Sequence, residues 1–168
     1  MKILFLCFLG VVFFGLFVGL IGLFLPPTRS VSGMREIAAP QDRVWQIITG
    51  LAAQPTWRSD IASVDVTDTT PGKERWVERP RKGPPIQFLT ESMTQKTAWK
   101  VRFSGPAEGI WCCRLEPISE QRTRIYVEES SMVQNYWARV LARLVFDPQA
   151  FLDGYLDQLS KAAAQNGG

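Results

Sequence analysis

Residues 97–132 have the sequence TAWKVRFSGPAEGIWCCRLEPISEQRTRIYVEESSM, in which apolar and polar side chains alternate in three short runs separated by turn-forming residues. Alternation with a period of two places Trp99, Val101 and Phe103 on one face of a strand, with Lys and Arg between them on the other face. Short strands joined by turns are typical of an antiparallel meander. We therefore expect strands at 97–104, 109–117 and 122–132.

The same alternation defines the inner faces of the two later strands. Trp111 and Leu115 share a face of their strand, and Ile125 and Val127 share a face of the next one. Glu129 continues the register of Ile125 and Val127. A carboxylate is therefore expected on the inward side of the last strand, whereas its neighbour Tyr126 should point outward.

Four more strands and a helix are expected on the N-terminal side of this stretch. Asp68–Gly72 and Arg81–Pro85 are rich in Pro, Gly, Thr and Lys, which is a strong turn signal. Pro40 suits the first turn of a helix, in which apolar residues then recur at helical spacing. That apolar stripe consists of Val44, Ile47, Ile48 and Leu51. The additional strands are predicted at 30–38, 62–67, 73–79 and 86–93.

The C-terminal segment has helical periodicity. Its apolar residues follow one face at a period of 3.6, with Arg139 and Arg143 away from that face. Asp147 is a good N-cap and Pro148 fits a first turn, so we expect one kinked amphipathic helix or two abutting helices. The predicted stripe consists of Val133, Trp137, Val140, Leu141, Leu144, Phe151, Leu152, Tyr155, Leu156 and Leu159.

The N-terminal segment has the composition of a membrane anchor. The 23 residues from Ile3 to Leu25 contain no charged side chain, and a helix of that length spans the ~30 Å hydrocarbon core of a bilayer. Pro26-Pro27 then forms a short, stiff linker. A cleaved secretory signal is the alternative, but the apolar run is long for one and the best cleavage site, at 30–32, is poor. We therefore predict an uncleaved, single-pass membrane anchor.

The anchor sequence leaves its orientation and its partners open. Lys2 lies on one side of the apolar run and Arg29 and Arg35 on the other, so the positive-inside rule does not assign the soluble domain to a side of the membrane. Gly15 and Gly19 form a GxxxG pair, which would allow two copies to form a homodimer through this helix. Glycine is also common in membrane helices, so the pair alone does not establish a dimer.

Composition restricts the chemistry of the remaining part. The formal net charge is only +3, and basic and acidic residues are interspersed, so no nucleic-acid partner is expected. The chain has no histidine, which removes Ser-His-Asp and Cys-His catalysis and the commonest metal ligand. Cys112 and Cys113 should point to opposite faces of a strand as free thiols. The sequence contains no signal for a metal or a cofactor.

Three segments of the chain resemble one superfamily. Residues 37–48 (IAAPQDRVWQII) followed by Trp57, residues 123–129 (TRIYVEE), and residues 139–146 (RVLARLVF) through Tyr155-Leu156 are similar to the START-like and polyketide cyclase/dehydrase-like helix-grip proteins of the SRPBCC superfamily. The resemblance covers about residues 30–164. Its motifs are loose hydrophobic patterns, which specify the fold better than the function.

The resemblance implies an α+β, helix-grip fold, in which a curved antiparallel sheet wraps around a long C-terminal helix, here preceded by one transmembrane helix. We expect residues 1–27 to form the anchor and linker, and residues 28–168 to form the START-like domain. The resemblance also implies a cavity between the sheet and the helix for a lipid or another small hydrophobic ligand. Its expected lining is Trp57, Phe88, Trp99, Val101, Phe103, Trp111, Ile125, Val127, Glu129, Leu152 and Tyr155.

Three functions are consistent with these observations. The first is a membrane-tethered binder of a lipid or other apolar molecule. The second is a cyclase- or dehydratase-like enzyme, which needs an ionisable group inside a real cavity. The third is a non-catalytic interaction module, in which the aromatic residues simply fill a core. The acid–base or nucleophile candidates for an enzyme are Asp60, Glu91, Glu128, Glu129, Tyr155 and Cys113.

Overall fold

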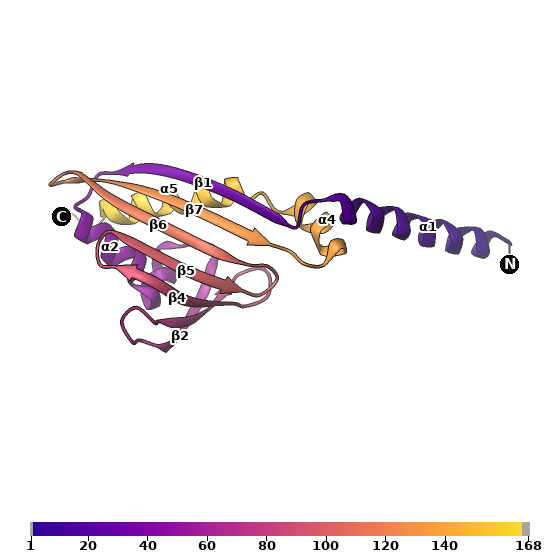
Figure 1. Ribbon diagram of the computed structural model, residues 1–168, viewed down its shortest axis with the longest axis horizontal. Coiled ribbons are helices and arrows are strands. Elements are labelled where there is room, and N and C mark those ends of the chain that lie inside the picture. Colours follow the sequence, from indigo (N-terminus) through magenta and orange to yellow (C-terminus); the bar gives the residue numbers. More distant parts are fainter. Residues whose placement is uncertain (1, 166–168) are drawn as a thin grey trace.

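The computed structural model describes the backbone of residues 2–165 and the side chains of residues 9–10, 12–13 and 15–165 (Figure 1). A helix, α1 (Lys2–Phe24), leads into a single curved sheet, and further helices cover one face of that sheet. The strands are β1 (Thr28–Ile37), β2 (Ile61–Asp68), β3 (Arg75–Pro80), β4 (Ile86–Thr94), β5 (Ala98–Ser104), β6 (Glu108–Ser119) and β7 (Arg122–Met132).

The seven strands form one antiparallel sheet in the order β1-β7-β6-β5-β4-β3-β2. Strands β2 to β7 follow one another as a meander, and β1 closes the sheet by pairing with β7 over its whole length. All seven strands were predicted from the sequence, because each combines period-two alternation with turn residues at its ends. The α+β prediction with a curved sheet packed on a C-terminal helix is therefore confirmed.

The core lies between the sheet and two helices, α2 (Gln41–Thr49) and α5 (Pro148–Gln165), while η1 (Leu51–Ala53) and α3 (Gln54–Trp57) connect α2 to β2. The predicted apolar stripe of α2 and η1 is buried, as are the inward residues of β5 and, on β7, Ile125 and Val127. Gly33 in β1 lets α5 approach closely, because a Cβ at this position would lie 2.9 Å from Cδ1 of Leu156. Tyr126 lies on the outer face, as predicted, with Arg114 over its ring.

The C-terminal segment differs from the single stripe expected over residues 133–159. It forms two separate helices, α4 (Tyr136–Val145) and α5, and Asp147 Oδ1 caps α5 by accepting from the backbone N of Gln149 at 2.9 Å and of Ala150 at 3.1 Å. None of the ten residues of α4, all of which the structure describes, is buried. Of the two alternatives, two helices are therefore observed. The expectation that Trp137, Val140, Leu141 and Leu144 share one apolar face with the residues of α5 is wrong, because the break before Asp147 turns α4 away from the sheet.

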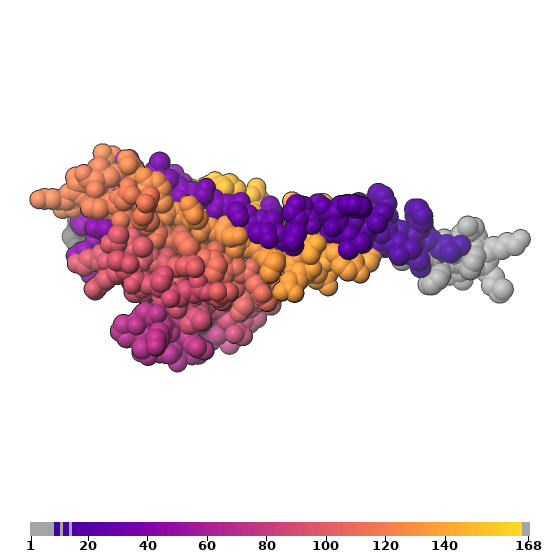
Figure 2. Space-filling model, in the orientation of Figure 1, coloured from indigo at the N-terminus to yellow at the C-terminus, as the bar shows by residue number. Residues whose placement is uncertain are grey.

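Helix α1 projects from the end of the domain at which α4 lies (Figure 1), and in the space-filling view it extends as a rod beyond the sheet (Figure 2). Residues 9–10, 12–13 and 15–165, which are described in full, contain no helix that is both long and apolar enough to cross a bilayer. The side chain of Ile3 lies outside the described residues. Leu25 is half-buried at the end of α1.

The small residues of α1 face α4 of the same chain. A Cβ at Gly15 would lie 3.8 Å from the Trp137 ring, and one at Gly19 would lie 2.9 Å from Cζ2 of the same ring. A Cβ at Gly22 would overlap the carbonyl oxygen of Tyr136. In this structure the face that would mediate the predicted homodimer is therefore covered by α4 of the same chain.

Candidate functional site

An unbroken row of aromatic rings lines the concave side of the sheet and reaches α5. Trp57 lies 5.6 Å from Tyr155, and Tyr155 lies 6.0 Å from Trp111, both measured between ring centroids. The row continues through Trp99 on β5 to Trp76 on β3 and Phe88 on β4, and it ends at Phe103 on β5, with neighbouring centroids no more than 6.1 Å apart. In order, its members are Trp57, Tyr155, Trp111, Trp99, Trp76, Phe88 and Phe103.

The residues predicted to line a cavity fall into two groups. One group is packed in the core with at most 9% of its surface exposed, and it consists of Trp99, Val101, Phe103, Ile125, Val127 and Leu152. The other group is only partly buried, and it consists of Trp57, Phe88, Trp111, Glu129 and Tyr155. The structure brings Trp57, Trp111 and Tyr155 together at the interface between the sheet and α5.

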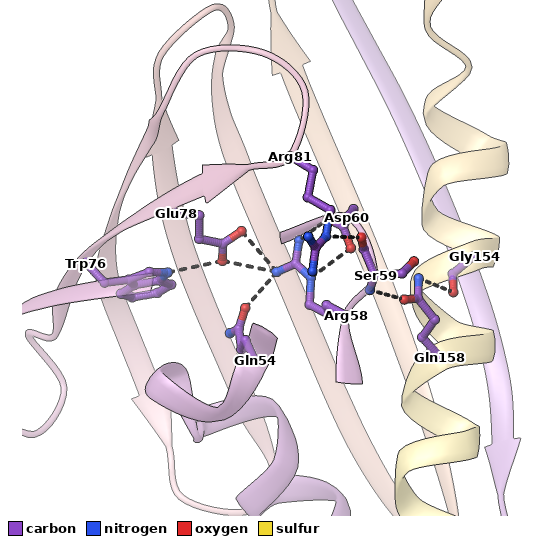
Figure 3. A network of polar contacts seen from close by, with 9 residues as sticks. All are labelled: Gln54, Arg58, Ser59, Asp60, Trp76, Glu78, Arg81, Gly154 and Gln158. Atoms are coloured by element: carbon purple, nitrogen blue, oxygen red, sulfur yellow. Dashed lines mark hydrogen bonds and ion pairs between the residues drawn. The ribbon is translucent and has the colours of Figure 1, made fainter. Parts of the chain in front are cut away.

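A buried network of charges lies beside that end of the row (Figure 3). Arg58, just after α3, donates through Nη1 to both carboxylate oxygens of Glu78 at 3.0 and 3.1 Å and to Oε1 of Gln54 at 2.7 Å. Its Nη2 forms an ion pair with Asp60 at 2.7 Å, and its guanidinium carbon lies 5.6 Å from the centroid of Tyr155. The network therefore joins α3, β3 and α5 around one buried cation.

Two hydrogen bonds extend this network to its surroundings (Figure 3). The indole N–H of Trp76 donates to Oε1 of Glu78 at 3.2 Å, and Gln158 of α5 accepts from the backbone N of Ser59 at 2.6 Å. Burial raises the pKa of Glu78, and the attraction of Arg58 works against that rise. Burial also disfavours the charged guanidinium, but Glu78 and Asp60 outweigh it and raise the pKa of Arg58. Arg58 therefore stays cationic at every physiological pH.

Sequence reasoning missed Arg58, Glu78 and Gln54 as members of this site. One signal was available for Glu78, because it is two residues from Trp76 on a predicted strand and must share its inward face. Nothing in the local pattern indicated that Arg58 would be buried, since it follows a short helix and the residue that it neutralises is 20 positions away.

Two polar groups, on Trp57 and Glu129, lie near the Trp57–Trp111 end of the row. The indole Nε1 of Trp57 is buried and has no hydrogen-bond acceptor among the described residues. Glu129 pairs across the sheet with Val31 and Trp111, and it also borders a surface depression of about 570 Å³. Burial alone raises the pKa of Glu129. The inward position predicted for this carboxylate from the alternation of β7 is confirmed.

The other predicted acid–base candidates are separated by the structure. Asp60 and Tyr155 both belong to the surroundings of Arg58, and burial raises the pKa of the Tyr155 hydroxyl. Glu91 forms ion pairs with Lys100, at 2.9 Å, and with Arg102, and its pKa is lowered by these neighbours. Glu91 is thus a carboxylate held in ion pairs, whose lowered pKa disfavours a role as a proton donor.

Cysteine chemistry is disfavoured in this fold. Cys113 is buried and Cys112 is partly exposed, which confirms that they point to opposite faces. Burial raises the pKa of the Cys113 thiol to about 12, so this thiol stays protonated near neutral pH and is a poor nucleophile. Within the described residues, no group of three or more acidic or cysteine side chains is arranged to hold a metal ion.

Comparisons with known proteins agree with this architecture. The family model described as polyketide cyclase / dehydrase and lipid transport matches residues 28–163. No curated protein matches the chain significantly. Among solved structures, the Zhui aromatase/cyclase from a Streptomyces species is similar with a TM-score of 0.67 at 12% identity, over 82% of this chain and 94% of that one.

Two further solved structures have similar folds. Norcoclaurine synthase from Thalictrum flavum, in complex with dopamine and hydroxybenzaldehyde, gives a TM-score of 0.64 at 13% identity, over 84% of this chain and 89% of that one. A protein from Thermus thermophilus gives a TM-score of 0.67 at 18% identity, over 83% of this chain and all of the other. At such low identities these likenesses establish the shared fold only.

Proposed function

Because the chain belongs to the polyketide cyclase / dehydrase and lipid transport family, we propose that its domain binds a small apolar or amphipathic molecule, such as a lipid, next to a membrane. The binding site would lie between the sheet and α5, at Trp57, Trp111 and Tyr155. Ligand pockets are lined mainly by apolar and aromatic side chains with a few polar groups that fix orientation. This end of the aromatic row has that composition.

The observation that carries the proposal is the buried indole N–H of Trp57, which has no acceptor among the described residues. A buried donor without a partner destabilises a fold by about 1–3 kcal/mol. A ligand oxygen, such as a lipid carboxylate or carbonyl, would satisfy this donor while its chain contacts Tyr155 and Trp111. A completely filled core, as in an interaction module, would leave the donor unexplained.

Membrane attachment rests on α1. The 23 residues from Ile3 to Leu25 are uncharged, and large apolar side chains on the described part of α1, including Phe13 at 75% and Phe24 at 82%, are exposed. Large exposed apolar surfaces mark contacts with membranes or other proteins. We propose that α1 attaches the domain to a bilayer, which would keep the binding site close to its lipid source and raise the ligand's effective concentration.

The first prediction concerns ligand uptake. We expect the full chain, incubated with palmitic acid in detergent and analysed by native mass spectrometry, to retain one palmitate per chain. Trp111→Leu should lower the retained fraction several-fold, because it removes a ring that contacts Tyr155. The matched control is Tyr126→Leu, which removes an aromatic ring from the outer face and should change nothing. Equal retention by all three proteins, or by none, would refute binding at this site.

An enzyme of the cyclase or dehydratase type is the second candidate, and Glu129 is the observation that favours it. Glu129 lies opposite Trp111 in the sheet, and burial raises the pKa of this carboxyl, which favours a role in giving or accepting a proton. The family description includes cyclases and dehydrases as well as lipid transport. A bound ligand with an acidic C–H group, such as one next to a carbonyl, close to the carboxyl of Glu129 would support this alternative.

The second prediction tests the state of Glu129 through the pH dependence of stability. A carboxyl whose pKa is raised in the folded state stabilises the fold below its unfolded-state pKa, and this stabilisation is lost as pH rises through the folded-state pKa. Glu129→Gln should therefore be more stable than the wild type at pH 7, and the difference should vanish toward pH 4. Urea denaturation of both full chains across this range measures the effect. A constant difference would show that Glu129 is not desolvated.

A further inference from the structure

Helix α4 presents, on the side away from α1, an apolar surface that none of the described residues covers. Leu141 is 62% exposed, Leu144 79% and Val145 72%, and the exposed apolar surface continues into Phe146 and Phe151. The helix is well formed nevertheless, because Asn135 Oδ1 caps it by accepting from the backbone N of Trp137 at 2.9 Å. A stable helix with one apolar and one polar face that lies outside the core is typical of a segment that binds at a membrane interface.

The position of α4 is determined by α1. The ring of Trp137 lies against Gly19, and Arg139 donates from Nη1 to the carbonyls of Gly22, at 3.5 Å, and Leu25, at 3.4 Å. Gly22 lies in the last turn of α1 and Leu25 directly follows the helix, where no intrahelical donor remains to satisfy these carbonyls. Helix α4 is therefore attached to the end of α1 nearest the domain, at the boundary between the uncharged segment and the polar chain. In Figure 2 its residues lie along the base of α1.

A basic depression lies at this boundary. It has a volume of about 360 Å³ and is lined by Arg29, Arg143, Leu144, Val145, Phe146 and Asp147. Each arginine uses one terminal nitrogen in a backbone hydrogen bond, Arg29 to Phe146 O at 3.1 Å and Arg143 to Pro26 O at 3.2 Å, so each retains further N–H donors. Asp147, the one acidic member, already accepts two backbone N–H groups as the cap of α5.

We propose that this depression binds the phosphate of an anionic bilayer phospholipid, with the acyl chains of that lipid lying against Leu144, Val145 and Phe146. The inference rests on the proposed membrane attachment of α1, since only a chain held at a bilayer would bring this surface to the headgroups. Guanidinium groups match phosphate geometry, and Trp and Tyr, here Trp137 and Tyr136, are favoured at the membrane interface. Arg29 and Arg143 would bind the headgroup phosphate, and the apolar surface beside them would contact the acyl chains of the same phospholipid molecule.

The test is native mass spectrometry of the full chain released from micelles that contain equal amounts of phosphatidylglycerol and phosphatidylcholine. We expect the wild type to retain phosphatidylglycerol preferentially. The double variant R29Q/R143Q should lower that retention about tenfold or more, because each basic residue near an anionic lipid contributes about a factor of five. The control R79Q/R102Q removes two exposed arginines from the sheet and should retain the lipid as the wild type does.

The design separates this inference from the proposed function. R29Q/R143Q should leave palmitate retention unchanged, whereas Trp111→Leu should lower palmitate retention and leave phosphatidylglycerol retention unchanged. If Trp111→Leu loses both palmitate and phosphatidylglycerol while R29Q/R143Q retains both, phosphatidylglycerol binds in the interior. That result would overturn the surface site. Equal retention of the two phospholipids, or displacement of phosphatidylglycerol by an excess of inorganic phosphate, would also overturn it. Failure of the full chain to enter bilayer nanodiscs would instead refute membrane attachment itself.

Discussion

Arg58→Met should destabilise the full chain by about 3–5 kcal/mol at pH 7, because it leaves Glu78 buried without its counter-charge. The side chains of Arg58 and Glu78 are only 9% and 5% exposed, so water cannot replace the lost partner. Urea denaturation in a mild detergent measures the loss. The loss should be smaller at pH 4, where the unpaired Glu78 can fold in its protonated form.

Two further variants separate the charge effect from packing. R58M/E78Q should be more stable than Arg58→Met, because a neutral amide replaces the stranded carboxylate and can still accept from Trp76. Arg79→Met breaks an ion pair of 2.9 Å with Asp65 in which both side chains are about half exposed, and it should lose less than about 1 kcal/mol. Equal losses for Arg58→Met and Arg79→Met, or a loss independent of pH, would contradict this account of the network.

Trp99→Ala should lose about 3–5 kcal/mol and leave a space that external indole can fill. Trp99 is 4% exposed and lies in the middle of the aromatic row, 5.6 Å from Trp76 and 5.9 Å from Trp111 between centroids. An apolar cavity of this kind binds small aromatic molecules. The thermal midpoint of Trp99→Ala should therefore rise when indole is added, by more than that of the wild type.

Trp99→Phe is the matched control, because it keeps an aromatic ring between Trp76 and Trp111. It removes part of the indole ring and its N–H, which donates to Thr90 Oγ1 at 3.0 Å. It should lose less stability than Trp99→Ala and gain nothing from indole. A loss below about 1 kcal/mol for Trp99→Ala would indicate that the middle of the row surrounds an open space and is not a packed core. The ligand site would then extend further along the sheet than Trp57, Trp111 and Tyr155.

The strands and their faces could be predicted because both depend on local periodicity. The inward positions of Trp99, Val101 and Glu129 follow from an alternation of two residues, which any strand imposes on its side chains. Local rules were also sufficient for α2, whose apolar residues recur at helical spacing, and for the cap at Asp147, because Asp is a favoured N-cap residue. The strand alternation also assigned Cys112 and Cys113 to opposite faces, without any knowledge of what packs against them.

The location of α4 could not be predicted in this way. Helical periodicity placed Trp137, Leu141 and Leu144 on one apolar face, but it did not predict which other surface that face would pack against. Helices α2 and α5 pack on the inner face of the sheet, and the break before Asp147 turns α4 toward α1. The contact of Trp137 with Gly19 joins segments more than 100 residues apart, so no local pattern contains it.

The sequence by itself therefore determined the elements, the order of the strands along the chain, the inner face of the sheet and the family, because short-range sterics and hydrophobic periodicity act within a few residues. The tertiary structure decided which polar groups meet. The pairing of β2 with β3 brings Arg58 to Glu78, and the packing of α5 brings it to Tyr155, while the docking of α4 on α1 places Arg29 and Arg143 around one depression. These contacts depend on the three-dimensional path of the chain, which is determined by packing between residues that are far apart in the sequence.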